Sequence, residues 1–155
     1  MVKRVLFVCT GNICRSPTAE GVALHMIHSG GLGAHVHVDS AGTHGYHVGE
    51  APDPRTLKAA ARRGYDLSPL RARKLELRDF QDFDLLLAMD RGHLDLMKRA
   101  CPEVYRPKLD LFLRYAAKTG FDEVPDPYYG GPQGFEMVLD MCEAGVDGLL
   151  DRIGA

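Results

Sequence analysis

Apolar residues form short runs of strand length, separated by stretches with helical spacing. Residues 5–8 (VLFV) and 85–89 (LLLAM) contain no polar side chain, which is typical of strands buried on both faces. Residues 35–38 alternate between polar and apolar and predict another strand. Residues 108–113 predict a fourth strand that leads into a helix start. The chain is therefore expected to contain four strands.

The segments between the strands carry helix signals. After the first strand we expect Ser16 to be an N-cap and Pro17 the first helical residue, because proline lacks only a hydrogen that would be unpaired there. This helix extends to residue 29. Further helices are expected over residues 53–63, 90–100 and 135–153, the last with the clearest three-and-four spacing of apolar residues. Residues 41–52, 67–74 and 120–132 are expected to be irregular.

This alternation of strand and helix predicts a single α/β domain over residues 1–155. Its fold class is a doubly wound sheet of four parallel strands with helices on both faces. Ligands of such sheets bind beyond the carboxyl ends of the strands. Cys9, Ser40 and Asp90 each follow a predicted strand, so we expect them at one rim of the sheet.

Composition and charge narrow the class of protein. The 155 residues are 45% hydrophobic and carry a net charge of −2, which does not favour binding to nucleic acid or to acidic membranes. The first apolar run ends at Val8, which is too short for the core of a signal peptide. Four cysteines, two of them in one polar loop, are typical of reduced thiols. We therefore expect a cytoplasmic protein.

The loop after the first strand, residues 9–15 (CTGNICR), contains the candidate chemistry. A tight loop before a helix directs backbone N–H groups into one concavity, and the helix dipole makes that concavity suitable for an anion. A cysteine is a nucleophile only as a thiolate, and these donors together with Arg15 favour the anionic sulfur of Cys9. Arg15 can bind a phosphoryl group through two parallel hydrogen bonds. Gly11 and Asn12 both tolerate the positive φ that such a curl requires.

The run CTGNICRSP at residues 9–17 resembles the active-site loop of the low-molecular-weight protein tyrosine phosphatases. The resemblance extends to DSAGT at residues 39–43, AMD at residues 88–90 and DPY at residues 126–128. The order, spacing and total length of these motifs also fit, so the resemblance covers nearly the whole chain. It implies hydrolysis of phosphotyrosine and other aryl phosphates.

The resemblance also implies roles for individual residues. Cys9 would attack phosphorus and form a phosphocysteine intermediate, while Arg15 binds the phosphate. Asp126 would be the general acid and base, although from the residues alone an aspartate before a proline is equally a turn signal. Asn12 and Ser40 would support the loop. The expected substrate-binding residues are Thr10, Gly11, Asn12, Ile13, Cys14, Ser16, Tyr46, Tyr128 and Tyr129.

Ser16, by the same resemblance, would donate a hydrogen bond to the Cys9 sulfur. Cys14 is either a space-filling residue or a thiol that forms a disulfide with an oxidised Cys9. No metal or organic cofactor is implied, because the histidines and cysteines give no familiar ligand spacing. The expected partners are phosphotyrosine proteins such as tyrosine kinases or their targets, with inorganic phosphate as product and inhibitor. Neither nucleic acid nor membrane is expected as a partner, and the chain is expected to be a monomer or weak dimer.

Two positions depart from the family pattern. Tyr46 stands where the family commonly has a tryptophan that forms one wall of the slot for the substrate ring. Leu70 lies where the family often has a histidine linked to the asparagine network.

Two rival functions share part of this pattern. Thiol-based arsenate reductases share the fold and the oxyanion loop, but need two further cysteines on a later segment, and residues 82–89 contain none. A catalytically idle phosphotyrosine-binding module would not need Cys9, Arg15 and Asp126 together.

Overall fold

The computed structural model describes residues 2–116, 119–127 and 131–153. These residues form a four-stranded sheet in the order β2-β1-β3-β4, and each neighbouring pair of strands is parallel. The strands are β1 (Lys3–Cys9), β2 (Val36–Gly42), β3 (Leu85–Ala88) and β4 (Leu109–Leu111). The fold class predicted from the apolar pattern is therefore confirmed.

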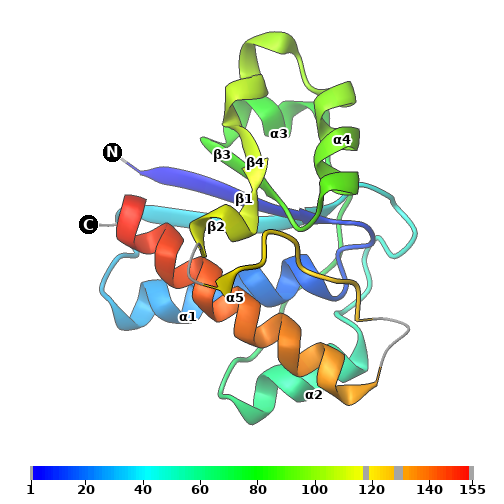
Figure 1. The fold of residues 1–155 in the computed structure, drawn as a ribbon, viewed down its shortest axis with the longest axis vertical. Coiled ribbons are helices and arrows are strands. Elements are labelled where there is room, and N and C mark those ends of the chain that lie inside the picture. Colours follow the sequence, from blue (N-terminus) through cyan, green and yellow to red (C-terminus); the bar gives the residue numbers. More distant parts are fainter. Residues whose placement is uncertain (1, 117–118, 128–130, 154–155) are drawn as a thin grey trace.

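Helices cover both faces of the sheet (Figure 1). The first face packs against α1 (Arg15–Ser29) and α5 (Pro132–Ile153), with α2 (Pro54–Arg62) against α5. The second face packs against α3 (Leu77–Asp82) and α4 (Arg91–Ala100). Two short 3₁₀ helices, η1 (Glu103–Lys108) and η2 (Phe112–Tyr115), flank β4. No helix within the described residues is long and apolar enough to cross a membrane.

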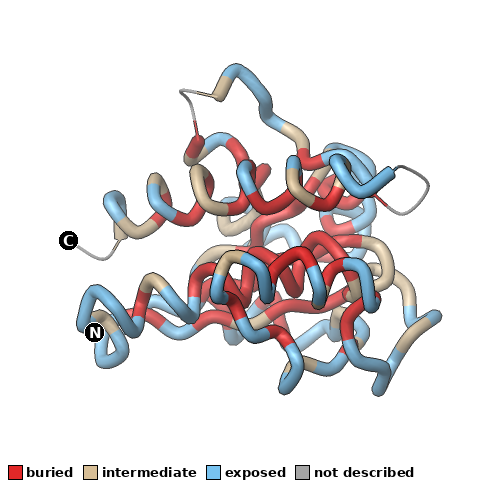
Figure 2. Tube along the Cα trace, turned by 90° about the horizontal axis from the view of Figure 1, so that it is seen from below, coloured by how far each residue is buried: buried red, intermediate tan, exposed pale blue. Residues whose placement is uncertain are grey.

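The alternation of side chains along β1 divides the core into two layers. Val5, Phe7 and Cys9 belong to the cluster on the α1 and α5 side, and Leu6 and Val8 to the cluster on the α3 and α4 side. All five residues are buried, and Figure 2 shows buried segments concentrated at the centre of the molecule. Burial on both faces explains why β1 is an unbroken apolar run.

Helix α1 begins earlier than its sequence signals predict. It starts at Arg15 with Cys14 as the N-cap, so Ser16 is not the cap and Pro17 is not the first helical residue. The Ser16 side chain forms hydrogen bonds within the loop instead of capping the helix. Pro17 remains in the first turn, where the missing N–H leaves no carbonyl unsatisfied. The sequence signal located the helix start to within two residues but assigned the wrong role to Ser16.

The start of α5 and the segment before β3 also differ from expectation. Helix α5 starts at Pro132, three residues before the predicted start at Phe135. Helix α3 was not predicted, and it begins with a reciprocal pair of hydrogen bonds between Glu76 and Asp79, the capping-box arrangement. Two acidic residues form this capping box in place of the usual Ser/Thr and Glu pair, so the sequence does not match the common pattern for a helix start.

The end of β2 packs directly on the loop that follows β1. The backbone N–H of Thr43 donates to the carbonyl of Cys9 (2.8 Å), and that of His44 donates to the carbonyl of Thr10 (3.0 Å). A Cβ atom on Gly42 would lie 2.6 Å from the Thr10 carbonyl oxygen, so only glycine allows this approach. The DSAGT motif therefore anchors the loop to the sheet.

Candidate active site

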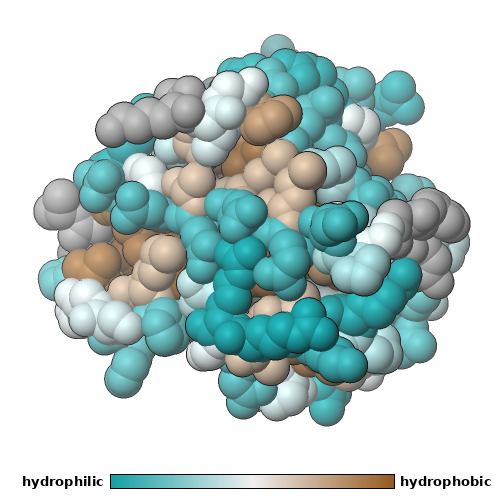
Figure 3. All heavy atoms as spheres, turned by 60° about the horizontal axis from the view of Figure 1, so that its bottom comes forward, coloured by the Kyte–Doolittle hydropathy of each residue, from teal (hydrophilic) through white to brown (hydrophobic). Residues whose placement is uncertain are grey.

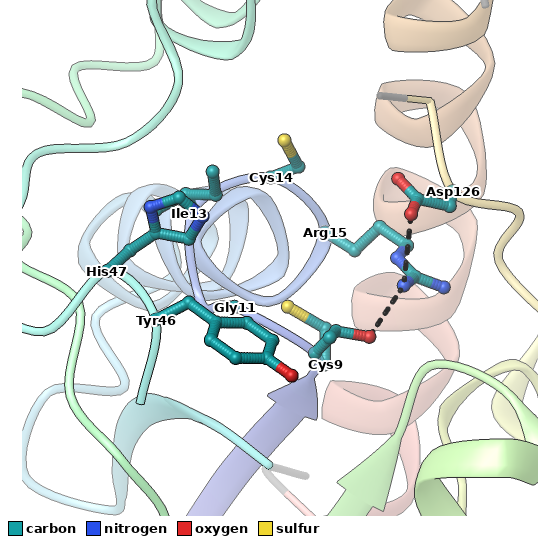
Figure 4. Close-up of a pocket in the computed structure, with 9 residues that line it drawn as sticks. Cys9, Gly11, Ile13, Cys14, Arg15, Tyr46, His47 and Asp126 are labelled. Carbon is teal, nitrogen blue, oxygen red and sulfur yellow. Dashed lines mark hydrogen bonds and ion pairs between the residues drawn. The ribbon is translucent and has the colours of Figure 1, made fainter. Parts of the chain in front are cut away.

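A cavity of about 270 Å³ opens at the carboxyl end of β1 (Figure 4). Most of its wall comes from the loop after β1, with further residues from two segments distant in sequence. The residues that line it are Cys9, Thr10, Gly11, Ile13, Cys14, Arg15, Tyr46, His47 and Asp126. The fold therefore brings together Cys9, Arg15 and Asp126, the three residues that the sequence marked for chemistry.

Asn12 supports the loop from behind. It is buried and has a φ of 59°, the left-handed conformation that asparagine tolerates better than most residues. Its side-chain nitrogen donates to the hydroxyl oxygens of Ser16 (2.8 Å) and Ser40 (2.9 Å). Its side-chain oxygen accepts from the backbone N–H of Arg73 (3.0 Å). That backbone donor fixes the orientation of the amide, because the reverse orientation would oppose two N–H groups.

The asparagine in turn fixes the direction of the hydrogen bond at the nucleophile. The Ser16 hydroxyl oxygen lies 2.9 Å from the Cys9 sulfur. An amide nitrogen only donates, so the Ser16 oxygen accepts from Asn12 and its own hydrogen is free to point to the sulfur. A thiolate at Cys9 is therefore presented with a buried donor.

A buried carboxyl group ends the other branch of this network. The Ser40 hydroxyl donates to Glu20 Oε1 at 2.6 Å. Burial raises the pKa of Glu20 to about 7, although the hydrogen bond from Ser40 acts in the opposite direction. No sequence pattern indicated Glu20, because a glutamate in the first turns of a helix is usually solvated.

The Arg15 guanidinium is buried and held by several acceptors. Its Nη1 donates to Asp90 Oδ2 (2.8 Å) and to the carbonyl of Val124 (3.1 Å). Its Nη2 lies 3.4 Å from Thr10 Oγ1. Nη2 also forms a longer ion pair with Asp126 Oδ2, at 3.9 Å. Figure 4 shows the guanidinium between Asp126 and the loop, so the fold holds the charge at the cavity wall.

Asp90 has two structural roles. It caps α4 by accepting the backbone N–H of His93, and it pairs with Arg15. Burial alone would raise the pKa of Asp90, but the His93 N–H and the Arg15 guanidinium outweigh it and hold the pKa below its usual range. Asp90 is thus a carboxylate near neutral pH, and it neutralises part of the charge of Arg15 from behind.

Tyr46 and His47 form the rim of the cavity, and Tyr46 is more exposed to solvent than the residues of the loop. Tyr46 is 73% exposed, and its ring stacks on that of His44 with the centroids 5.1 Å apart. His47 lines the cavity and packs against Gly11, where a Cβ would lie 2.9 Å from the imidazole Cδ2. His47 also contacts Glu50, with Nδ1 2.6 Å from Oε2. The sequence did not single out His47.

Cys14 lines the cavity from the side away from Cys9. Both are free cysteines, and in Figure 4 their sulfurs do not point toward each other. Burial raises the pKa of the Cys14 thiol to about 12, so this group is protonated at neutral pH. A Cys9–Cys14 disulfide would require at least one of the side chains to rotate.

The remaining predicted residues fall into three groups. Ile13 and Thr10 line the cavity, whereas Ser16, Asn12 and Ser40 lie behind it. Tyr128 and Tyr129 lie outside the described residues. Within residues 2–116, 119–127 and 131–153, no group of three or more His, Cys, Asp or Glu side chains is arranged to hold a metal ion.

Comparison with known proteins identifies the family. Residues 4–155 match the family described as "Low molecular weight phosphotyrosine protein phosphatase". The chain belongs to this family. A low molecular weight protein-tyrosine-phosphatase of Streptomyces coelicolor is 48% identical over 99% of this chain and 94% of its own. The low molecular weight phosphotyrosine protein phosphatase of Homo sapiens is 38% identical over 90% of this chain and 89% of its own.

Structural comparison agrees with the sequence match. A crystal structure of a protein tyrosine phosphatase from Entamoeba histolytica, with Hepes in the active site, has a TM-score of 0.94. It is 38% identical and covers 98% of this chain and 97% of its own. Membership of the low molecular weight phosphatase family confirms the resemblance seen in the sequence and the enzyme class that it implies.

Proposed function

We propose that this protein hydrolyses phosphotyrosine and other aryl phosphates through a phosphocysteine intermediate on Cys9. The observation that carries the proposal is the meeting of three groups in one cavity: the Cys9 sulfur with a Ser16 donor, the buried Arg15 guanidinium, and the Asp126 carboxyl group. Membership of the phosphatase family supports the same reaction.

In the first step the Cys9 thiolate attacks phosphorus, and the bond between phosphorus and the aryl oxygen breaks. Arg15 and the backbone N–H groups of the loop bind the equatorial oxygens, where charge develops in the transition state. Expelling a phenolate is slow without a proton, because the pKa of the phenol is about 10. Asp126 supplies that proton to the leaving oxygen. The products of this step are the phenol and a phosphocysteine.

In the second step water attacks the same phosphorus atom and the sulfur leaves. The Asp126 carboxylate accepts a proton from the water, which returns it to its starting state. The Ser16 hydroxyl hydrogen stabilises the departing thiolate of Cys9. Inorganic phosphate is released and, because it fits the same loop, also acts as a product inhibitor. The half-exposed position of Asp126 beside the cavity suits it to exchange protons with leaving groups and water.

The rim residues and Cys14 have secondary roles in this proposal. Tyr46 forms a wall for the aromatic ring of the substrate, and the substrates are phosphotyrosine proteins such as tyrosine kinases or their targets. Oxidation of Cys9 by a peroxide gives a sulfenic acid, which the Cys14 thiol converts to a disulfide with loss of water. The buried, protonated state of Cys14 makes that capture slow.

Steady-state kinetics of three proteins test the proposal. The wild type is expected to hydrolyse p-nitrophenyl phosphate, and Cys9→Ser is expected to have no measurable turnover. Asp126→Asn is expected to lose about 10²- to 10⁴-fold with phenyl phosphate and much less with p-nitrophenyl phosphate, because p-nitrophenolate leaves without a proton. Turnover by Cys9→Ser would reject the nucleophile. Equal losses of Asp126→Asn on both substrates would remove Asp126 from the general-acid role.

A further inference from the structure

A buried histidine lies behind the guanidinium of Arg15. His93 is the third residue of α4, the helix that begins just after β3 at the same end of the sheet as the cavity (Figure 1). Its side chain is 6% exposed. The imidazole contacts Asp90 through Nδ1 and both Thr10 and Arg15 through Nε2. It therefore connects the helix cap to two residues of the phosphate loop.

Asp90 determines which ring nitrogen of His93 carries the proton. Nδ1 lies 3.1 Å from Asp90 Oδ1, an oxygen that also accepts the backbone N–H of His93 (3.0 Å). Nδ1 makes no aligned hydrogen bond, so this contact is electrostatic. A carboxylate presents only lone pairs, and a lone pair on Nδ1 would be repelled. The proton therefore belongs on Nδ1, and Nε2 is an acceptor.

With Nε2 as an acceptor, His93 determines the orientation of the Thr10 hydroxyl and contacts the Arg15 guanidinium. Thr10 Oγ1 lies 2.7 Å from Nε2, close enough for the hydroxyl to donate to it. The lone pairs of that hydroxyl then face Arg15 Nη2, which lies 3.4 Å from Thr10 Oγ1 and 3.4 Å from Nε2. With Nη1 held by Asp90 and Val124, acceptors contact both ends of the guanidinium.

We propose that His93 is a positioning residue for phosphate binding: its neutral ring, with Nε2 as acceptor, orients the Thr10 hydroxyl and the Arg15 guanidinium toward the phosphoryl oxygens. This inference rests on the proposed function, because it assigns the loop to phosphate. A proton on Nε2 would turn the Thr10 hydroxyl around and direct an N–H at the guanidinium. The ring must therefore remain neutral while the site works.

The surroundings of His93 keep the ring neutral. Burial and, second, the positive charge of Arg15 lower the pKa of His93 to about 4. Asp90 and Asp126 act in the opposite direction, and His44 adds a small repulsion. Near neutral pH the imidazole is therefore uncharged beside a permanent cation.

Two substitutions of His93 distinguish the effect of losing the Nε2 acceptor from the effect of losing the volume of the ring. His93→Leu keeps an apolar side chain but removes the acceptor, whereas His93→Gln places an amide oxygen near the position of Nε2 and cannot be protonated. We expect Leu to raise the dissociation constant of inorganic phosphate, measured by calorimetry at pH 6.5, about tenfold, and Gln to restore most of the affinity. Thermal unfolding of each variant shows whether it is folded. Equal affinity in wild type and Leu, or equal loss in Leu and Gln, would overturn the proposal.

A pH series and a spectrum of the wild-type ring test the same assignment through the protonation state of His93. The ratio of phosphate affinity between wild type and His93→Gln is expected to fall as the pH drops from 5 through 4, as wild-type His93 gains its proton. In the ¹⁵N spectrum of the wild-type ring, Nδ1 is expected to be protonated and Nε2 unprotonated from pH 5 to 8. A constant ratio, or a proton on Nε2 in that range, would refute the positioning role. These readouts need no turnover, so inactivity toward aryl phosphates would count against the proposed function alone.

Discussion

The loop of residues 9–16 and the rim of the same cavity are built in opposite ways. In the loop, Cys9, Asn12, Arg15 and Ser16 are buried, and each contacts hydrogen-bond partners within the fold. At the rim, Tyr46 is largely exposed and is held mainly by stacking on His44. The face of the molecule seen in Figure 3 is mostly hydrophilic, with hydrophobic residues visible between the hydrophilic ones. The groups that would bind the phosphate are thus buried and hydrogen-bonded, whereas the aromatic ring that would contact the substrate is exposed.

The proposed function gives a reason for this difference. Donors aimed at a developing charge are effective only if they need no reorganisation when the reaction occurs. An exposed aromatic wall can adapt to different rings at small cost. The loop should therefore respond strongly to single substitutions, and the rim weakly.

Among the residues outside the proposed chemical steps, the largest effect is expected at Asn12. Asn12→Ala removes the two side-chain donors to Ser16 and Ser40 and places a less tolerant residue at a φ of 59°. We expect kcat/KM for p-nitrophenyl phosphate to fall about 100-fold and the free energy of unfolding to drop by roughly 2 kcal/mol. Both are measured on purified protein by steady-state kinetics and urea denaturation.

Asn12→Gly is the matched control, since glycine accepts a positive φ but also lacks the amide. The same loss of activity in Gly and Ala assigns the effect to the hydrogen bonds. Wild-type activity in either variant would show that the loop needs no buried support, and the contrast with the rim would disappear.

A smaller effect, with a distinct pH dependence, is expected at Glu20. The pKa of this carboxyl rises from 4.5 to about 7 on folding. Stability from the protonated form is therefore fully present below pH 4.5 and is lost as the pH rises through 7. Glu20→Gln remains neutral, so relative to this variant the wild type is expected to lose on the order of 2 kcal/mol between pH 5 and pH 8.

Urea denaturation of both proteins at the two pH values measures this difference. Glu103→Gln, at an exposed glutamate of η1, is the control and is expected to show little dependence on pH. A Glu20→Gln effect of the same size at pH 5 and pH 8 would mean that the carboxyl group is not buried with its proton.

The smallest effect is expected at the rim. Tyr46→Ala should raise KM for aryl phosphates by about three- to tenfold, the contribution of one aromatic contact, and leave kcat nearly unchanged. Inhibition by inorganic phosphate should not change, because phosphate contacts the loop and not the ring. Tyr46→Phe retains the ring and is expected to behave like the wild type. A matching loss of phosphate inhibition in Tyr46→Ala would show that Tyr46 supports the loop rather than the substrate.

The two regions also differ in how far their residues could be predicted from the sequence. The loop was found because its residue types are adjacent and a buried strand precedes them. Asp126 required the family resemblance, since an aspartate before a proline is also ordinary turn chemistry. The pattern of four strands was sufficient for the fold, although it missed α3, where acidic residues form the cap.

Asn12 and Ser40 were expected to support the loop, but two further residues of this network, Glu20 and His93, were not predicted. Glu20 contacts Ser40 from α1, and His93 contacts Thr10 of the loop from α4, so both contacts depend on how these helices pack on the sheet. For His93 a usable signal was the spacing from Asp90, since a cap and the residue three positions later face each other. Leu70 marked the absence of a histidine, and the backbone N–H of Arg73 satisfies the Asn12 amide oxygen instead. Every residue except proline has a backbone N–H, so the residue type at position 73 could not predict this hydrogen bond.

The proposed mechanism requires Cys9 to carry the phosphoryl group during turnover. The direct measurement is to quench the wild type with acid during hydrolysis of p-nitrophenyl phosphate and to map the phosphorylated peptide by mass spectrometry. We expect phosphate on Cys9, and none on the same peptide when substrate is omitted. Phosphate attached to another residue, or turnover with no phosphorylated cysteine under conditions that preserve a phosphocysteine standard, would contradict it.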